Sequence, residues 1–587
     1  MAGRWLRWCR WVVAACLLAG CSLEGGAVVR PTALPLPTPT APPDAPAADP
    51  GWRLGVTEEP VDLYPYSFNA RAAAPLIELL YPAPLTVVSE AYTTSGVLER
   101  VPSFANGDVA YITTTVNLDA SGAITQTQTG TITSVRQLAV TYRWNPNLRW
   151  ADGAPVTAAD SVFAFQVLRG SAATPQLSIQ SDLTADYVAV DEHTTKAFLP
   201  PGRDDPNYLS TVWTPLPRQR FEGTPTPQQV AEALGRDPLG YGPYRLTSWT
   251  TQLEFARAES AAAFAGSFPE RLTVRMFPDL AMLRADIAAG LTDVGWSEAL
   301  PGQQREPLAA DAAAGKLQAM SSPTPIWEHL DFNLAVPALQ DIRMRRAIAL
   351  GFNRQALVAE LYGADGRAWD SWIAPESWAY APDRLTRYPY DPAQANALLD
   401  EMGYKDANGD GTRDRPDSQP FTLTLITSEQ TAVRQAISNR LVADMAALGV
   451  QIDVRTLSTQ QLYSQQGPLF QRQFELALFG WLRGADPDGA VLWSCAAIPN
   501  QINNFTGDNF TGWCIDTADA AIRAASATLD QTARGSAYAD HQEIMSRELP
   551  IVPLFDRRLT VIARPAIKGV QPDPFAPLTW NLARWQR

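Results

Sequence analysis

The spacing of hydrophobic and polar positions changes along the chain and separates predicted strands from predicted helices. Residues 108–145 are rich in threonine and β-branched residues and are interrupted by Asp119-Ala120-Ser121-Gly122, which predicts strands joined by a turn. A helix is expected to begin near Thr157, with Asp160 in its first turn. Its inward-facing residues are expected to be Val162, Phe163, Phe165 and Leu168.

A strand–helix–strand pattern follows in the C-terminal half. Apolar residues alternate over 421–426, which predicts a strand, and a second strand is expected over 450–457. Between them one helical face ends at Gly449 and contains Val433, Ile437, Leu441, Met445 and Leu448. This order predicts an α/β domain in which helices pack over a sheet.

Three more helices are expected, over 280–290, 341–362 and 391–402. The last has the clearest start, because Asp391 is a good N-cap and Pro392 suits the first helical position. No fixed-period repeat is present in the sequence.

The first twenty residues have the organisation of a secretory signal. Three arginines precede an apolar run of about ten residues, and Leu18-Ala19-Gly20 then leads to Cys21. The run is too short to cross a bilayer as a mature helix. Because the cysteine stands at the cleavage point, the segment resembles a bacterial lipoprotein signal: residues 1–20 would be removed and Cys21 lipidated. An ordinary signal peptide with an incidental cysteine is the alternative.

Residues 21–51 are predicted to be a linker. Eight of the twenty residues 31–50 are proline, which favours an extended, semi-rigid polyproline II spacer. Folded sequence is expected to begin near Trp52. The linker would therefore hold a globular body away from a membrane.

Length and charge narrow the class of protein further. A chain of 587 residues is too long for one core and predicts two or three domains. The formal charge is −14, and −17 once the three arginines of the signal are removed. Since lysines and arginines are not clustered, nucleic acid is not an expected partner. No apolar run after residue 21 approaches the ~20 residues that a membrane span needs.

Only Cys495 and Cys514 remain after the signal and the lipid site are set aside. An even pair in an oxidising compartment predicts a disulfide. The alternative, a free catalytic thiol, would need a partner base, and none of His193, His329 and His541 lies in a recognisable catalytic motif.

Motifs of hydrolases and nucleotide-binding enzymes are absent from the sequence. It contains no His-Glu-x-x-His, no Gly-x-Ser-x-Gly and no phosphate-binding glycine loop, which favours a binding protein over an enzyme. Trp369, Trp372 and Trp378 form a local cluster that is expected either to line a cleft or to belong to the core.

Residues 406–417 have the spacing of a calcium loop. Oxygen-bearing residues stand at positions 1, 3, 5, 9 and 12, a glycine stands at position 6 and Thr412 stands at position 7. The candidate ligands are Asp406, Asn408, Asp410, Thr412 and Asp417. A structural calcium ion is one expectation, and a plain Asn/Asp/Gly turn is the other; Pro416 favours the turn.

Six segments, taken in order, carry a resemblance to one family. They are 148–162 (LRWADGAPVTAADSV), 239–246 (LGYGPYRL), 331–333 (DFN), 341–349 (DIRMRRAIA), 390–404 and 550–554 (PIVPL). Together they resemble the extracellular solute-binding proteins, family 5, of ATP-binding-cassette importers, the group that binds dipeptides, oligopeptides and nickel. The resemblance covers essentially all of 52–587.

The resemblance implies an α/β, two-lobed, periplasmic-binding-protein-like fold of type II, in its large cluster with an extra insertion domain. Lobe I would combine three segments, lobe II would be a strand-rich insertion, and lobe III would be continuous. The implied boundaries are 52–85, 205–325 and 550–587 for lobe I, 86–204 for lobe II and 326–549 for lobe III.

The family also implies where a ligand would bind. Peptide-binding members have a tryptophan wall on the loop that follows the predicted strand 474–479, with an aspartate three residues later for the peptide ammonium. Trp481 matches the wall, but Gly484 stands where the aspartate is expected, next to Arg483. Asp486 is a substitute candidate for the amine, and Arg483 is a candidate for an anionic group; a plain turn at 486–489 is the other interpretation.

The expected function is that of a lipid-anchored, extracytoplasmic, monomeric receptor that captures peptides by hinge closure and passes them to a membrane permease with its ATPase subunits. It would need no cofactor. An oligosaccharide or another non-peptide solute, a sensory role and an extracellular hydrolase are the alternatives.

Overall fold

A computed structural model describes residues 51–67, 70–119, 124–125, 131–171, 175–298, 302–428 and 431–587. The predicted signal, Cys21 and the linker up to residue 50 lie outside these residues. The described residues belong to one compact unit, Asp49–Arg587. None of the helices described is long and apolar enough to cross a membrane.

The strands of the described residues are β1 (Trp52–Val56), β2 (Thr86–Val88), β3 (Ala91–Thr93), β4 (Val109–Leu118), β5 (Ile124–Thr125), β6 (Thr131–Arg143), β7 (Asp186–Asp191), β8 (Thr194–Phe198), β9 (Tyr244–Trp249), β10 (Gln252–Arg257), β11 (Arg271–Met276), β12 (Val294–Ser297), β13 (Gln318–Phe332), β14 (Thr422–Ser428), β15 (Gln451–Leu457), β16 (Leu476–Leu482) and β17 (Ile551–Ala563).

The α-helices are α1 (Ala70–Leu80), α2 (Ala158–Leu168), α3 (Pro175–Leu183), α4 (Pro227–Gly235), α5 (Leu280–Ala288), α6 (Gly302–Ala313), α7 (Pro337–Gln340), α8 (Ile342–Gly351), α9 (Arg354–Tyr362), α10 (Pro392–Glu401), α11 (Ala432–Ala446), α12 (Thr459–Tyr463), α13 (Ala490–Trp493), α14 (Asp516–Ser526) and α15 (Gln531–Glu548). Short 3₁₀ helices are η1 (Tyr208–Thr211), η2 (Arg218–Arg220), η3 (Glu259–Ala263), η4 (Gly363–Asp365), η5 (Pro382–Arg384), η6 (Cys495–Ala497) and η7 (Leu578–Arg584).

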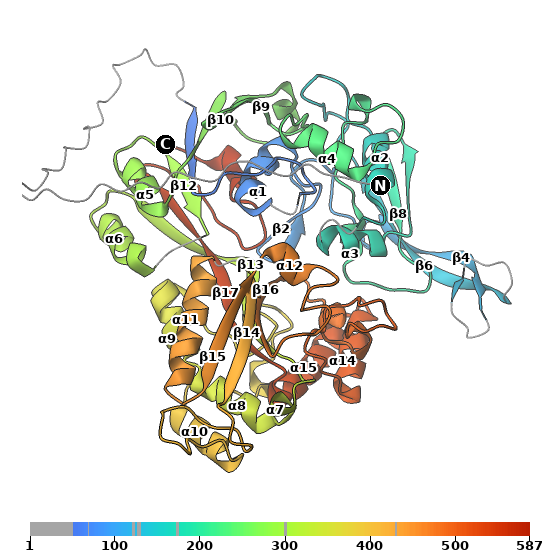
Figure 1. The fold of residues 1–587 in the computed structure, drawn as a ribbon. Helices are drawn as coiled ribbons and strands as arrows, with labels where there is room; N and C mark the ends of the chain where they lie inside the picture. Colours follow the sequence, from blue (N-terminus) through green and yellow to red (C-terminus); the bar gives the residue numbers. More distant parts are fainter. Residues whose placement is uncertain are drawn as a thin grey trace, which may run out of the picture. The chain divides into compact units, whose positions relative to one another are not determined.

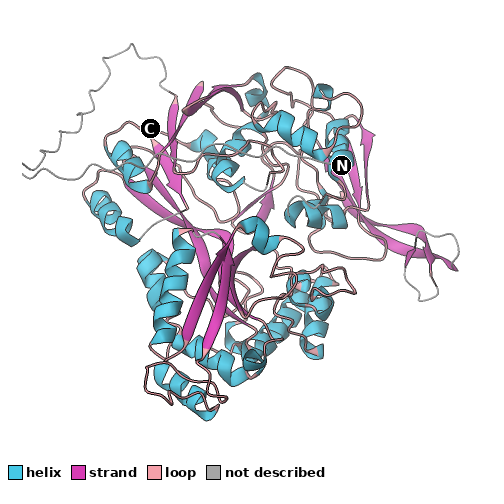
Figure 2. Cartoon of the chain, in the orientation of Figure 1, coloured by secondary structure: helices cyan, strands magenta, loops and turns pink. Residues whose placement is uncertain are grey.

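Within the described residues the strands form three sheets. The largest has ten strands in the order β15-β14-β16-β13-β17-β12-β1-β11-β10-β9. A five-stranded sheet has the order β5-β4-β6-β8-β7, and β2 and β3 form a separate hairpin. Figure 2 shows helices flanking the strands of the large sheet. The predicted α/β class is confirmed.

Local signals predicted several elements correctly. α2 begins after Thr157, whose backbone N–H donates to the Asp160 carboxylate at 2.8 Å in a capping box. β14 and β15 are parallel and joined by α11, as the strand–helix–strand pattern predicts. In α10 the Asp391 side chain accepts the backbone N–H of Gln394.

The single helix predicted over 341–362 is wrong, because two helices, α8 and α9, occupy this segment. The chain turns at Phe352 and Asn353. The Asn353 side chain accepts the backbone N–H of Ala356 at 3.0 Å, and its own backbone N–H donates to Asp444 at 2.8 Å. An N-cap in the interior of an apolar pattern therefore starts a second helix.

The two long strands β13 and β17 connect different hydrophobic cores. They pair antiparallel from Gln318 opposite Ala563 to Asp331 opposite Ile551, and Figure 1 shows them running between the strands near β12 and those near β14. One end of β17 packs in the core of β14 to β16, and its other end packs with β1 and β12. The predicted lobe limits at 325/326 and 549/550 fall at these strands and stay a prediction.

The predicted insertion shares a core with its neighbours. The five-stranded sheet and α2 lie within 86–204, but their buried side chains pack in one cluster with those of β1, β9 and β11. Trp150 of the predicted insertion meets Tyr241 edge to face, with ring centroids 5.4 Å apart.

A buried charge network lies where the two long strands pair. Glu328 of β13 is fully buried; Arg557 of β17 donates to it at 2.6 Å, and Arg434 of α11 lies at 3.4 Å. Burial disfavours the charged carboxylate, but the two guanidinium groups outweigh burial and lower the pKa of Glu328 to about 2. Three separate elements are thereby joined through one carboxylate.

The tryptophan cluster belongs largely to the core. Trp369 and Trp372 are buried, and Trp378 is half-buried against the same cluster. Trp372 Nε1–H donates to Nδ1 of the fully buried His541 at 3.2 Å. Burial lowers the pKa of His541 to about 3, so this imidazole is neutral at physiological pH.

Glu328→Ala is expected to destabilise the fold by about 3–5 kcal/mol, because it leaves Arg557 and Arg434 buried without their counter-charge. Urea denaturation followed by circular dichroism measures the loss. The exposed Glu222→Ala is the control and is expected to change stability by less than about 0.5 kcal/mol. A loss below about 1 kcal/mol for Glu328→Ala would contradict the role given to the network.

His541 is expected to make the fold acid-sensitive. The pKa of His541 is lower in the folded chain than in the unfolded chain. Its contribution to the free energy of unfolding is therefore complete above pH ~6.5 and is lost as the pH falls toward 3. The difference in stability between the protein and His541→Gln should shift by about 1.4 kcal/mol for each pH unit between 6 and 4. Urea midpoints at several pH values test this; parallel pH curves for the two proteins would refute it.

Candidate binding cleft

A cleft with a cavity volume of about 500 Å³ lies between segments that are far apart in sequence. The volume is within the range of small-molecule sites. Its lining comes from the turn of the β2–β3 hairpin, from β13, from a C-terminal segment and from two positions of the predicted lobe III. The lining residues are Ser89, Glu90, Met320, Ser321, Ser322, Pro323, Glu376, Arg483, Pro572, Asp573, Pro574 and Phe575.

The β2–β3 turn enters the cleft in a strained conformation. Ser89 and Glu90 both have positive φ, 50° and 65°, where residues other than glycine are disfavoured. The Ser89 backbone N–H donates to Asp573 at 2.8 Å, and Asp573 also accepts the backbone N–H of Phe575 at 2.9 Å. These bonds hold Glu90 at the wall of the cleft, where its Oε1 is buried and has no hydrogen-bond partner.

Arg483, one of the predicted site residues, lines the cleft. Its backbone N–H donates to Pro325 O at 2.8 Å, and its Nη2 donates to Glu376 Oε1 at 2.5 Å. The guanidinium lies 4.8 Å from the ring centroid of Phe575 and 6.0 Å from that of Trp369. Only 9% of the side chain is exposed. The anion-binding role of Arg483 stays a prediction, since its charge is already paired with Glu376.

Trp481 belongs to a strand, and the predicted end of that strand at Phe479 is wrong. β16 continues to Leu482 because Trp481 pairs with Trp327 of β13. The half-buried indole stacks on Phe510, with centroids 5.8 Å apart and an interplanar angle of 21°. Trp481 is therefore packed against its own core, outside the residues that line the cleft.

Gly484 and Asp486 follow Arg483 in an extended loop. Gly484 is exposed, and a Cβ there would approach Asp486 O to 3.0 Å. The Asp486 carboxylate accepts hydrogen bonds from both Nη groups of Arg534, one of them at 2.8 Å. Binding of a peptide ammonium by Asp486 stays a prediction, and the ammonium would compete with this bidentate pair.

A further acidic residue lies close to the cleft. Asp556 of β17 is only 5% exposed, and its pKa is raised to about 6 by burial, against the opposing effect of Arg558. The sequence carried no recognisable signal for Glu90, Glu376 or Asp556, because the strands and loops that bring them together are paired over long sequence separations.

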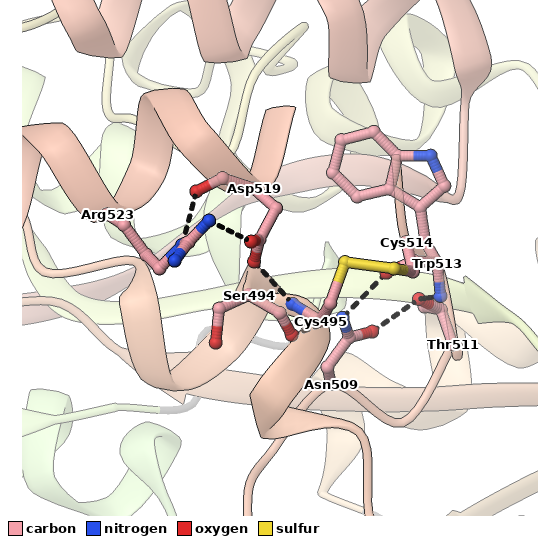
Figure 3. The surroundings of a disulfide bond; sticks show 8 residues. All are labelled: Ser494, Cys495, Asn509, Thr511, Trp513, Cys514, Asp519 and Arg523. Carbon is pink, nitrogen blue, oxygen red and sulfur yellow. Dashed lines mark hydrogen bonds and ion pairs between the residues drawn. A yellow bond between two sulfur atoms is a disulfide. The ribbon is translucent and has the colours of Figure 1, made fainter. Parts of the chain in front are cut away.

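The predicted disulfide is confirmed. Cys495 and Cys514 are bonded, with their Cα atoms 4.9 Å apart. Figure 3 shows the surrounding hydrogen bonds: Asn509 donates to Ser494 O and Trp513 O, and the Cys495 backbone N–H donates to Asp519 of α14 at 2.7 Å. The bridge thus fixes the segment that follows the Asp486 loop to a helix.

The predicted calcium loop forms a turn. Asp406 accepts the backbone N–H groups of Gly409, Asp410 and Gly411 at 2.7–3.2 Å, and Asp410 accepts that of Thr412 at 2.7 Å. Across the described chain, no group of three or more His, Cys, Asp or Glu side chains is placed to hold a metal ion. Calcium binding by Asp406, Asn408, Asp410, Thr412 and Asp417 stays a prediction.

Comparison with known proteins identifies a family and a fold. The sequence model of the bacterial extracellular solute-binding proteins, family 5, matches residues 126–501. The dipeptide-binding protein of Escherichia coli K12 is 23% identical over 452 residues, which cover 74% of this chain and 79% of that protein. The probable ABC transporter periplasmic-binding protein SapA of the same organism is 27% identical over 356 residues, 59% of each chain.

Solved structures share the two-lobed fold. The oligopeptide-binding protein AppA of Bacillus subtilis, solved with a nonapeptide, has a TM-score of 0.69 and 17% identity over 91% of this chain and 98% of its own. NikA of Brucella suis, solved with Fe(III)-EDTA, has a TM-score of 0.71 and 17% identity over 91% of this chain and 99% of its own. The predicted periplasmic-binding-protein fold is confirmed.

Replacing Cys495 and Cys514 together by serine is expected to lower the free energy of unfolding by about 3 kcal/mol, as the chain-entropy model predicts for a loop of this length. Urea denaturation of the variant and of the reduced protein measures the effect. The two should agree, since both remove the same cross-link; an unchanged midpoint in both would contradict a structural role for the bridge.

Proposed function

This chain belongs to the bacterial extracellular solute-binding proteins, family 5, and from that membership we propose that it captures peptides, from dipeptides to oligopeptides, in the cleft. The cleft itself carries the proposal. It is about 500 Å³ in volume, and its lining combines Glu90 and Phe575 with Glu376 and Arg483. The names of its relatives, which include a dipeptide-binding protein, support a peptide ligand.

The proposed capture uses hinge closure at β13 and β17. The pairing of these strands is irregular between Pro323 and Trp327, where Pro323 and Pro325 lack the N–H groups that a ladder needs. A weakened ladder between two separate cores is a suitable place for bending. A ligand that contacts both sides of the cleft would then favour the closed form by its differential affinity for that form.

The proposed receptor delivers its ligand to the permease and ATPase subunits of an ABC importer. We propose that it acts as a monomer outside the cytoplasm, held near the permease by a lipid on Cys21 and the linker 21–51. The family consists of solute-binding proteins of transporters, so the proposal includes binding and release and no catalytic step.

Peptide binding is tested by mass spectrometry of whatever co-purifies with the full chain, followed by calorimetry with di- to pentapeptides and with oligosaccharides. Peptides are expected to bind. Failure of every peptide, together with binding of an oligosaccharide, would refute the peptide proposal and leave the solute-binding family membership intact.

Phe575→Ala is expected to weaken peptide binding about tenfold, because it removes an aromatic wall of the cleft. The matched control is Phe104→Ala, another phenylalanine with exposed surface that lies outside the cleft lining. Calorimetry with the tightest peptide measures both. Equal affinities for Phe575→Ala and the unaltered protein would show that the ligand binds elsewhere.

A further inference from the structure

The charged residues lining the cleft are mostly acidic. Three carboxylates, those of Glu90, Glu376 and Asp573, face one guanidinium, that of Arg483. Asp573 is used by the fold, because it accepts backbone N–H groups from Ser89 and Phe575. Of the other two, Glu90 has an oxygen without a hydrogen-bond partner, and Glu376 is paired with Arg483.

The two glutamates differ in their partners within the fold. Oε1 of Glu90 is buried without a hydrogen-bond partner, although the strained β2–β3 turn presents it to the cleft. The Glu376 side chain is 45% exposed and pairs with Arg483. A carboxylate oxygen without a hydrogen-bond partner, presented by a strained turn, is typical of a binding function.

Asp556 adds an independent observation. It is 95% buried, and the Arg558 and Arg483 guanidinium groups oppose the effect of burial on its pKa. It stands opposite Trp327 in the ladder and interacts electrostatically with Glu376 and Arg483, which line the cleft. Asp556 is not one of the lining residues, and it adds negative charge behind the wall of the cleft.

Aromatic faces complete the surroundings. The Arg483 guanidinium lies over Phe575 at 4.8 Å and near Trp369 at 6.0 Å, and Trp369 stacks on Trp327 with centroids 5.8 Å apart. Carboxylates combined with aromatic rings attract ammonium and guanidinium groups. The chain already places one cation, Arg483, in these surroundings.

We propose that Glu90 and Glu376, here called the carboxylate pocket, bind a positively charged group of the ligand in competition with Arg483. The solute class is therefore cationic, a peptide with a lysine or arginine side chain or a free amine. The identification of the solute as a peptide rests on the proposed function; the selection for positive charge rests on the carboxylate pocket.

The test is calorimetry of the full chain with three end-blocked pentapeptides, Ala-Phe-X-Phe-Ala, in which X is lysine, norleucine or glutamate. The lysine peptide is expected to bind at least about tenfold more tightly than the norleucine peptide, and the glutamate peptide most weakly. The preference should diminish at high salt. Equal affinities for lysine and norleucine peptides would overturn the inference while leaving peptide capture standing.

Substitutions test whether the carboxylate pocket causes the preference for the lysine peptide over the norleucine peptide. Glu90→Gln and Glu376→Gln should each reduce lysine-peptide affinity about tenfold and leave norleucine-peptide affinity unchanged, whereas Arg483→Met should raise lysine-peptide affinity. Glu222→Gln, an exposed carboxylate outside the cleft, is the control. Equal effects of the glutamate variants on both peptides would also overturn the inference.

A non-peptide cation separates this inference from the proposed function. If no peptide binds, peptide capture fails, and binding of agmatine that Glu376→Gln abolishes would support the carboxylate pocket on its own. If agmatine also fails to bind, or binds equally to Glu376→Gln, the inference fails as well.

Discussion

The pairing of β13 with β17 is the constraint on which the structure depends. Each strand contributes side chains to two hydrophobic cores, so the cores cannot separate without breaking the same ladder. Glu328 is buried at this ladder between Arg557 and Arg434. The two guanidinium groups compensate the cost of burying its negative charge. The network joins this part of the strand pair to α11, whereas the prolines near residue 325 leave the neighbouring stretch with few ladder bonds. The stretch that we propose to bend therefore adjoins the buried charge network on the same pair of strands.

The C-terminal segment reaches the cleft because its two ends are held at one buried carboxylate. The Asp293 carboxylate forms salt bridges with the guanidinium groups of Arg564 and Arg587, each at 3.0 Å, and with that of Arg53 of β1 at 2.9 Å. Burial opposes this charge, but the arginines outweigh burial and hold the pKa of Asp293 below its usual value. Between Arg564 and Arg587 the chain passes the cleft and supplies Asp573 and Phe575. The wall of the proposed ligand site is therefore positioned by a salt-bridge cluster elsewhere in the sheet.

The sequence predicted what local chemistry determines and missed what distant pairing determines. Thr157 and Asp391 marked helix starts through caps that are complete within four residues. The family segments predicted the α/β fold and directed attention to Arg483, which lies in the cleft. The end of β16 and the position of Glu376 could not be predicted in this way. They depend on Trp481 meeting Trp327 and on Arg483 meeting Glu376, contacts that join residues more than 100 positions apart.

Hinge closure is tested most directly by the distance between spin labels at the exposed positions Val61 and Val491, measured by pulsed electron spin resonance. These positions lie in segments that pack with different cores. With hinge closure at β13 and β17, the distance distribution is expected to shorten and narrow when a lysine-containing peptide is added, because the ligand would bridge the two sides of the cleft. A distribution that stays unchanged under saturating peptide would contradict hinge closure and the proposal that these two strands form the hinge.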